Sequence, residues 1–237
     1  MRDEQQQLLA EVLDLFAQRF DKRAVLRGGM VLRLLGCERL TNDLDYVFVP
    51  YRSKKDIVGE VLAVLREMPN VSIRHRLHST CLRVDIARGA VAIQVEAKTA
   101  QQISTQILST GNIGRPFNLP PRLIRVVDYS VALADKMAAW NERRLLRDLY
   151  DIWFYLRLGV RPDETTLQRR LKKPTYSRLV KASEHFQGTT IEDFREFLLA
   201  HAQKLTDKQL ASELRDYLTA TELAGLSIKI RAEIAKW

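Results

Sequence analysis

The sequence is poor in the residues that bind zinc or form disulfides, with two cysteines and four histidines among 237 residues. Cys37 and Cys81 do not make a disulfide framework and have no metal-binding spacing, so both are expected to be small buried residues in a reducing cytosol. The histidines also lack a spacing typical of metal ligands. These shortages exclude a disulfide-stabilised scaffold and the usual zinc sites.

Long apolar segments are missing as well. No apolar run approaches the roughly 20 residues that span a bilayer, and residues 1–7 are polar and charged, unlike a signal peptide. The sequence also has no Walker-type phosphate loop and no nucleophilic triad motif. We therefore expect a cytoplasmic protein with no membrane partner, outside the P-loop enzymes and the triad hydrolases.

Basic residues are in excess. The chain has 38 Lys and Arg against 29 Asp and Glu, which gives a formal net charge of +9. Such a balance favours a polyanionic partner, namely RNA, DNA or a nucleotide. Basic residues crowd the segment from Arg143 to Lys181, with Tyr155 and Tyr176 between them. This pattern is typical of an RNA-contacting surface, although solvated helix faces give the same pattern.

Hydrophobic periodicity predicts an α+β half followed by an all-helical half. The expected strands are 24–27, 43–49, 71–77, 80–87 and 90–98. The expected helices of this half are 3–20, 30–35 and 56–68. Residues 108–121 are rich in glycine and proline and are predicted to form a loop or linker. We therefore expect two domains, 1–121 and 122–237, with the helical one contributing to the active-site cleft.

The stretch that carries chemistry begins at Gly28-Gly29, between strand 24–27 and the helix that follows it. Glycines let a triphosphate approach the backbone amides, and the start of a helix adds positive potential. Asp43 and Asp45 open the next strand, where residues two apart point to the same face. The two carboxylates therefore project together, while Leu44 points into the core.

Paired carboxylates on one face repel each other unless a cation lies between them. Hard oxygen ligands of this kind suit magnesium or manganese, and such a site activates a hydroxyl and neutralises a leaving pyrophosphate. Aspartate is unfavourable in strands, so Asp43 and Asp45 before the apolar run 46–49 indicate a function rather than solvent-facing strand residues. A third acid is expected from a neighbouring strand. Glu96 is favoured and Asp85 is the alternative; either could instead be a solvated hairpin residue.

The motif from Gly28-Gly29 to Asp43-Leu44-Asp45 resembles the signature of the DNA polymerase β-type nucleotidyltransferases. More narrowly, the chain resembles the AbiEii/AbiGii toxin family of nucleotidyltransferases. Members carry a glycine pair, an Arg-x-Ser-x-Asp-Leu-Asp segment, an acid on a hairpin strand, and a lysine followed by Arg-Asp-x-x-Asp. The matching positions here are 39–45, Glu96, Lys136 and 147–151, within roughly residues 24–156.

Three positions depart from the family pattern. Thr41 replaces the usual serine and keeps its hydroxyl, and Glu96 stands where aspartate is more frequent. Met30 follows the glycines where a small or hydroxylated residue is common, which argues against nucleotide contact at Met30. None of these changes removes a metal ligand.

The resemblance implies a nucleotidyltransferase-type mixed β-sheet flanked by helices and followed by an all-helical half. It assigns the metal, magnesium or manganese, to Asp43, Asp45 and Glu96. It assigns the nucleotide to Gly28, Gly29, Thr41, Lys136 and Arg147. Catalytic roles fall to Asp43, Asp45, Glu96, Lys136 and Asp148, and Asp148 shares a helical face with Asp151. Without the resemblance, Lys136 and these acids would be interpreted as an ion-paired helical hairpin.

The predicted activity is transfer of a nucleoside monophosphate from a nucleoside triphosphate to an acceptor hydroxyl. The family and the charge together predict RNA as acceptor, for which the 3′ end of tRNA is a candidate. The family further implies a toxin of a toxin–antitoxin or phage-defence system, with a cognate antitoxin. Two alternatives stay open: a small molecule or protein side chain as acceptor, and an inert module that binds nucleic acid or a partner protein.

Overall fold

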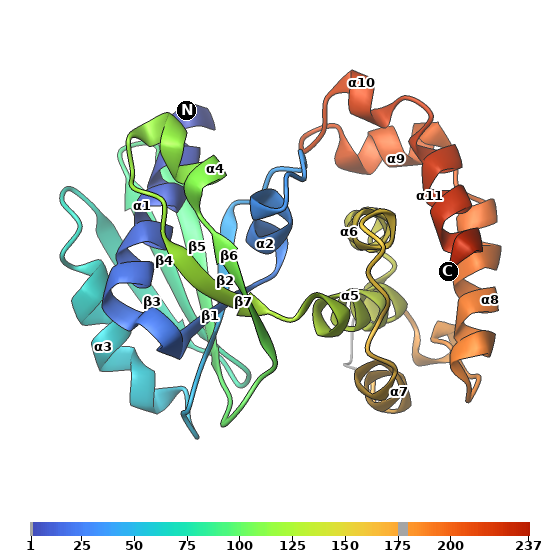
Figure 1. The fold of residues 1–237 in the computed structure, drawn as a ribbon, viewed down its shortest axis with the longest axis horizontal. Helices are drawn as coiled ribbons and strands as arrows, with labels where there is room; N and C mark the ends of the chain where they lie inside the picture. Colours follow the sequence, from blue (N-terminus) through green and yellow to red (C-terminus); the bar gives the residue numbers. More distant parts are fainter. Residues whose placement is uncertain (1, 175–179) are drawn as a thin grey trace. The chain divides into compact units, whose positions relative to one another are not determined.

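The computed structural model describes residues 2–174 and 180–237, and the chain divides into two compact units, Met1–Asp128 and Tyr129–Trp237 (Figure 1). The elements of the first unit are α1 (Arg2–Phe20), η1 (Asp21–Arg23), β1 (Ala24–Arg27), α2 (Gly29–Leu34), β2 (Asp43–Phe48), α3 (Lys55–Leu65), β3 (Ser72–Leu77), β4 (Leu82–Arg88), β5 (Val91–Thr99), β6 (Thr105–Ser109), α4 (Gly111–Gly114), η2 (Arg115–Phe117) and β7 (Leu123–Val127). Among the described residues, no helix has the length and hydrophobicity needed to cross a bilayer.

The seven strands form one mixed sheet in the order β3-β4-β5-β2-β1-β7-β6. The pairs β2–β5 and β1–β7 are parallel, and the other four pairs are antiparallel. Strand β2 is therefore central, with β5 on one side and β1 on the other. Strand β3 lies at one edge of the sheet and β6 at the other (Figure 1).

One face of the sheet packs on α1, which contacts β1, β2, β5 and the neighbouring helix α3 (Figure 1). Strand β2 sends Leu44, Tyr46 and Phe48 to this face, and all three are buried because alternate residues of a strand share a face. The ring of Phe48 meets Phe20 of α1 edge to face, with the ring centroids 4.9 Å apart. Such a pair adds about 0.5–1.5 kcal/mol to the burial of the rings.

The second unit is helical. Its elements are α5 (Tyr129–Arg143), α6 (Leu146–Arg157), α7 (Glu164–Lys172), η3 (Ala182–Glu184), α8 (Ile191–Gln203), α9 (Asp207–Leu214), α10 (Ala220–Leu223) and α11 (Leu226–Lys236). Helix α6 is the most buried of them and packs against α5, α9 and α11. Helices α8, α9 and α10 each begin with a capping box at Thr190, Thr206 and Thr219, which satisfies backbone donors at the helix start.

The α+β fold class predicted from the sequence is confirmed, and the helices and strands predicted up to residue 98 lie within a few residues of those observed. Strands β6 and β7 were not predicted, and residues 108–121, predicted as a loop or linker, contain the end of β6, α4 and η2. These two strands lie beyond β1 at one edge of the sheet, where the apolar residues Ile107 and Leu123 are exposed. Apolar and polar residues therefore do not alternate cleanly along their sequences. Because β7 belongs to the sheet, the first unit extends to Asp128 rather than to the predicted 121.

Candidate active site

Asp43 and Asp45 lie on the face of β2 opposite to the α1 side. In the sheet register, Asp45 is opposite Glu96 of β5 and Arg27 of β1, and Asp43 is opposite Gln94. Residues directly opposite each other on neighbouring strands share a face. The sheet therefore brings Asp45 and Glu96 side by side, as the sequence analysis expected. Both aspartates are half-buried.

The glycine pair packs closely against the residues at the start of β2 and just before it. Gly28 has a positive φ of 76°, and a Cβ atom added there would overlap Oδ2 of Asp45. A Cβ atom at Gly29 would lie 3.0 Å from Oγ1 of Thr41 and 3.0 Å from Nη2 of Arg39. Only glycine combines the positive φ with the lack of a side chain that this close approach requires. The backbone at position 28 therefore lies directly beside the Asp45 carboxylate.

Thr41 shapes the start of β2. Its hydroxyl accepts a hydrogen bond from the backbone N–H of Asp43 at 3.3 Å, an arrangement that hydroxyl side chains often adopt two residues before a turn or strand. The neighbouring Arg39 is only 6% exposed. Thr41 is thus placed beside Gly29 and Asp43, while its predicted contact with a nucleotide stays a prediction.

Glu96, the favoured third acid, forms an ion pair with an arginine side chain. Arg83 of β4 donates to Oε1 of Glu96 from Nη2 at 2.5 Å and from Nε at 3.2 Å, and Gln94 donates to the same oxygen at 3.1 Å. The hydrogen bond to Glu96 raises the pKa of Arg83. Asp85, the alternative acid, lies on β4, two strands from β2, whereas Glu96 lies on the adjacent strand β5. The geometry thus favours Glu96 by proximity, and Arg83 is a partner that sequence reasoning missed.

A metal site can be judged by the chemistry of its donors. Among the described residues, no three His, Cys, Asp or Glu side chains form a ready-made metal cage. Magnesium, however, is usually held by one or two carboxylates together with substrate phosphates rather than by an all-protein cage. Asp43 and Asp45 fit that requirement, because both project from one face of β2.

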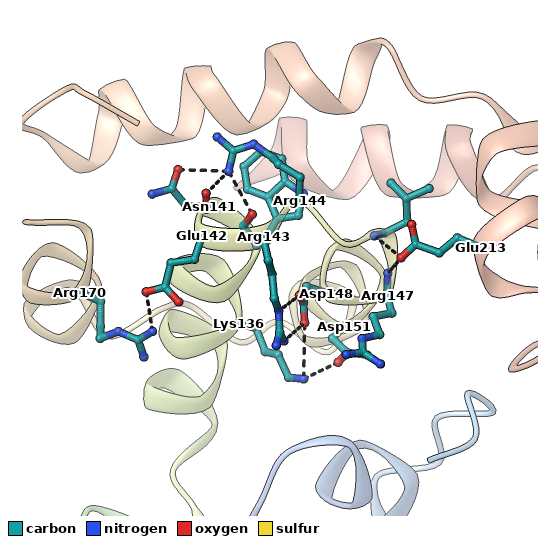
Figure 2. Close-up of polar contacts among 12 residues, drawn as sticks. Lys136, Asn141, Glu142, Arg143, Arg144, Arg147, Asp148, Asp151, Arg170 and Glu213 are labelled. Atoms are coloured by element: carbon teal, nitrogen blue, oxygen red, sulfur yellow. Dashed lines mark hydrogen bonds and ion pairs between the residues drawn. The ribbon is translucent and has the colours of Figure 1, made fainter. Parts of the chain in front are cut away.

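The helical unit contains a second cluster, in which α5 and α6 are joined by ion pairs (Figure 2). Nζ of Lys136 lies 2.6 Å from Oδ2 of Asp151 and 4.0 Å from Oδ1 of Asp148. Asp148 accepts two hydrogen bonds from Arg143, at 2.6 and 2.7 Å. The direct partner of Lys136 is therefore Asp151, which the sequence analysis had placed only on the same helical face as Asp148.

The acids of this cluster are fully buried, with exposed fractions of 1% for Asp148 and 0% for Asp151. Burial alone would lower the pKa of Arg143, but hydrogen bonds from Arg143 to Asp148 and the charge of Asp148 outweigh it, and the net pKa is raised. Buried carboxylates are tolerated only when they are paired in this way. The sequence gives no spacing signal for Arg143, because it ends α5 while Asp148 lies on α6, and the pair depends on how the two helices pack.

Arg147 lies in the first turn of helix α6, beside an acid of another helix. Oε1 of Glu213, on α9, accepts hydrogen bonds from the backbone N–H of Leu146 at 2.8 Å and of Arg147 at 3.4 Å (Figure 2). A carboxylate at this position satisfies the first amides of a helix and complements its dipole. The predicted role of the Arg147 side chain in nucleotide binding stays a prediction.

Comparison with known protein families identifies one family that matches most of the chain. Residues 8–227 match the family described as the nucleotidyl transferase AbiEii toxin of a type IV toxin–antitoxin system. The chain belongs to this family. As an AbiEii nucleotidyltransferase toxin it is a transferase that uses a nucleoside triphosphate, and its system implies an antitoxin partner. The sequence-based recognition and the prediction of an enzyme are thereby confirmed.

Solved structures agree with the family at the level of the fold. The nucleotidyltransferase toxin MenT4 from Mycobacterium tuberculosis H37Rv matches with a TM-score of 0.61 and 18% identity, over 96% of this chain and 82% of that one. JHP933 from Helicobacter pylori matches with a TM-score of 0.55 and 15% identity, over 98% and 91%. No curated protein sequence matches this chain.

Proposed function

We propose that this AbiEii toxin transfers a nucleoside monophosphate from a nucleoside triphosphate to a hydroxyl group of RNA and releases pyrophosphate, in a reaction that depends on magnesium or manganese. The observation that carries the proposal is the position of Asp43 and Asp45 on one face of β2, with Gly28 against Asp45 and Glu96 directly opposite it. The 3′ end of tRNA is the first acceptor to test, because the net charge of +9 favours a polyanion.

Asp43 and Asp45 would hold the metal. A divalent ion there supplies charge neutralisation for the phosphates and activates the attacking hydroxyl. Glu96 supports the pair from β5, and its ion pair with Arg83 keeps the negative charge of three neighbouring acids partly balanced when no cation is bound.

Gly28 and Gly29 would receive the phosphates. A residue with a side chain at position 28 would overlap the Asp45 carboxylate, so the glycine keeps the phosphate-binding backbone and the metal-binding acid in direct contact. Thr41, which contacts the backbone of Asp43, completes this end of the site with a hydroxyl.

We assign phosphate binding to Lys136 and Arg147 of the second unit on the strength of the family motif. A lysine acts on phosphate as a point charge. Asp151 and Asp148 lie on one face of α6 and fix the ammonium group from the buried side, so Asp148 is a positioning residue in this proposal.

The test is an incubation of the full chain with each labelled triphosphate, magnesium and total RNA. Asp43→Asn and Asp45→Asn are compared with wild type, and Asp216→Asn, an exposed aspartate of the second unit, is the matched control. We expect label in RNA with wild type and Asp216→Asn, and a loss of at least about 100-fold in either site variant, because a metal ligand contributes several kcal/mol to the transition state.

The other outcomes separate the alternatives. Label in protein or in a small molecule, again lost in Asp43→Asn and Asp45→Asn, would replace RNA as the acceptor. No metal-dependent transfer to any acceptor would overturn the proposed reaction. Thermal melting of each variant shows whether a loss of label reflects the site or the fold.

A further inference from the structure

Strand β3 forms an edge of the sheet and carries exposed cations. Arg74 and Arg76 are both exposed, and the register places their side chains on one face of the strand, two residues apart. Asp85 of β4 is directly opposite Arg74, but within residues 2–174 and 180–237 neither arginine forms an ion pair. The edge of the sheet therefore presents two guanidinium groups to solvent with no protein anion bound to them.

The register connects these cations to the carboxylates of β2. Arg76 is opposite Arg83, Arg83 is opposite Glu96, and Glu96 is opposite Asp45. These four residues form a single row across four adjacent strands, which we call the sheet row. Since directly opposite residues share a face, the exposed arginines and the acids lie on the same side of the sheet.

The charges along the sheet row change sign from its edge to its centre. The carboxylate of Glu96 balances Arg83, at 2.5 Å, but the next residue outward is Arg76, and like charges directly opposite each other on neighbouring strands are unfavourable. A phosphate bound between the two strands would remove this repulsion. Exposed Lys98, two residues beyond Glu96 on the same face of β5, adds a further cation.

The distance along the row indicates the size of the ligand. Neighbouring strands lie about 4.8 Å apart, so Arg76 is about 14 Å from Asp45 across three strand spacings. A small acceptor at Asp45 would not reach Arg76. A polynucleotide chain covers this distance in a few nucleotides, with a phosphate at each step.

We propose that the acceptor of this enzyme reaches Asp43 and Asp45 as a single-stranded RNA end, and that its phosphates contact Arg74 and Arg76 on β3. The inference rests on the proposed function for the chemistry at Asp45 and adds the surface that holds the acceptor. Arginine suits the task, because its planar fork binds phosphate oxygens bidentately and stacks on exposed bases.

The test measures RNA binding without any triphosphate, so that it does not depend on catalysis. The full chain, with magnesium, is titrated into a labelled 12-nucleotide single-stranded RNA at several salt concentrations, and anisotropy reports binding. Arg74→Gln/Arg76→Gln is compared with Lys22→Gln/Arg66→Gln, which removes the same charge from two exposed positions outside the sheet.

We expect the β3 variant to bind at least about fivefold more weakly than wild type, and the control variant to match wild type within about twofold. The slope of log affinity against log salt should fall by about 1.4, which is about 0.7 for each of two lost phosphate contacts. Equal affinity and slope in the β3 variant and wild type would overturn the inference. So would an absence of RNA binding by wild type, or tighter binding of a duplex RNA of the same length.

The outcome is separable from that of the proposed reaction. If single-stranded RNA binds and requires Arg74 and Arg76 but is never labelled, the reaction is wrong and the surface stands. If RNA is labelled and the β3 variant binds and labels it like wild type, the reaction stands and the surface is wrong. Both positions are exposed, so melting curves are expected to match wild type.

Discussion

At the scale of single residues, the geometry around Gly28 explains why the site tolerates little change. The backbone conformation requires glycine, and the space where a side chain would begin holds the Asp45 carboxylate. The sequence places the glycine pair and the aspartates in one motif. It could not predict that Gly28 touches Asp45, because that contact depends on the antiparallel pairing of β1 with β2.

We expect Gly28→Ala to reduce nucleotide transfer at least about tenfold, because the added methyl group must displace Asp45. Gly36→Ala is the matched control: Gly36 also has a positive φ, of 87°, but nothing lies within 4 Å of its added Cβ. The control should show only the backbone cost of about 1–2 kcal/mol in urea denaturation, with transfer retained. Equal activity losses in both variants would mean that strain, and not contact with Asp45, is responsible.

At the scale of elements, the strongest sequence signals came from strands with one apolar face. Strands β4 and β5 alternate between apolar and polar residues, and β2 ends in a buried apolar run, so all three were predicted. The short strands β6 and β7 have neither pattern and were missed. In the helical unit, the spacing of Asp148 and Asp151 predicted a shared face. Which acid pairs with Lys136 depends on how α5 packs on α6, and helical periodicity carries no information about that.

Asp151→Asn should destabilise the α5–α6 pair. The substitution keeps the size of the side chain but removes the charge that lies 2.6 Å from Lys136, leaving a largely buried ammonium with Asp148 at 4.0 Å. We expect a loss of about 3 kcal/mol in the free energy of unfolding by urea denaturation. Asp216→Asn, at an exposed position, should change it by less than about 0.5 kcal/mol. If Asp151→Asn lowered the free energy of unfolding by no more than Asp216→Asn does, Asp148 alone would suffice as the partner of Lys136.

At the scale of the whole molecule, the family match and the fold agree on a nucleotidyltransferase. The sequence motifs predicted the family from roughly residues 24–156, and the family match extends over residues 8–227. The positive charge of the chain predicted a polyanionic partner. For that partner the sequence pattern favours the segment from Arg143 to Lys181. The surface that we propose on β3 could not be predicted, because its basic residues join the acids of β2 only through the sheet register.

Metal binding should be measurable in the intact chain without catalysis. A ligand that binds only the folded state stabilises it, by about 1.4 kcal/mol at ten times its dissociation constant. We expect magnesium at saturating concentration, compared with EDTA, to raise the melting temperature by roughly 3–6 °C. The shift should disappear in Asp43→Asn/Asp45→Asn and persist in Asp216→Asn. A shift that survives in the site variant would place the metal elsewhere.

The order of charges along the sheet row has a consequence for how an RNA would be selected. Along this row the cations lie nearer the edge of the sheet than the acids, so an internal phosphate near Asp45 meets repulsion when no metal ion is bound, while a terminal hydroxyl does not. If the proposed function holds, the sheet row would therefore favour the end of an RNA strand at Asp45 over an internal segment of the strand. A closed circle of RNA could rest on β3 and still offer no terminal hydroxyl to the carboxylates.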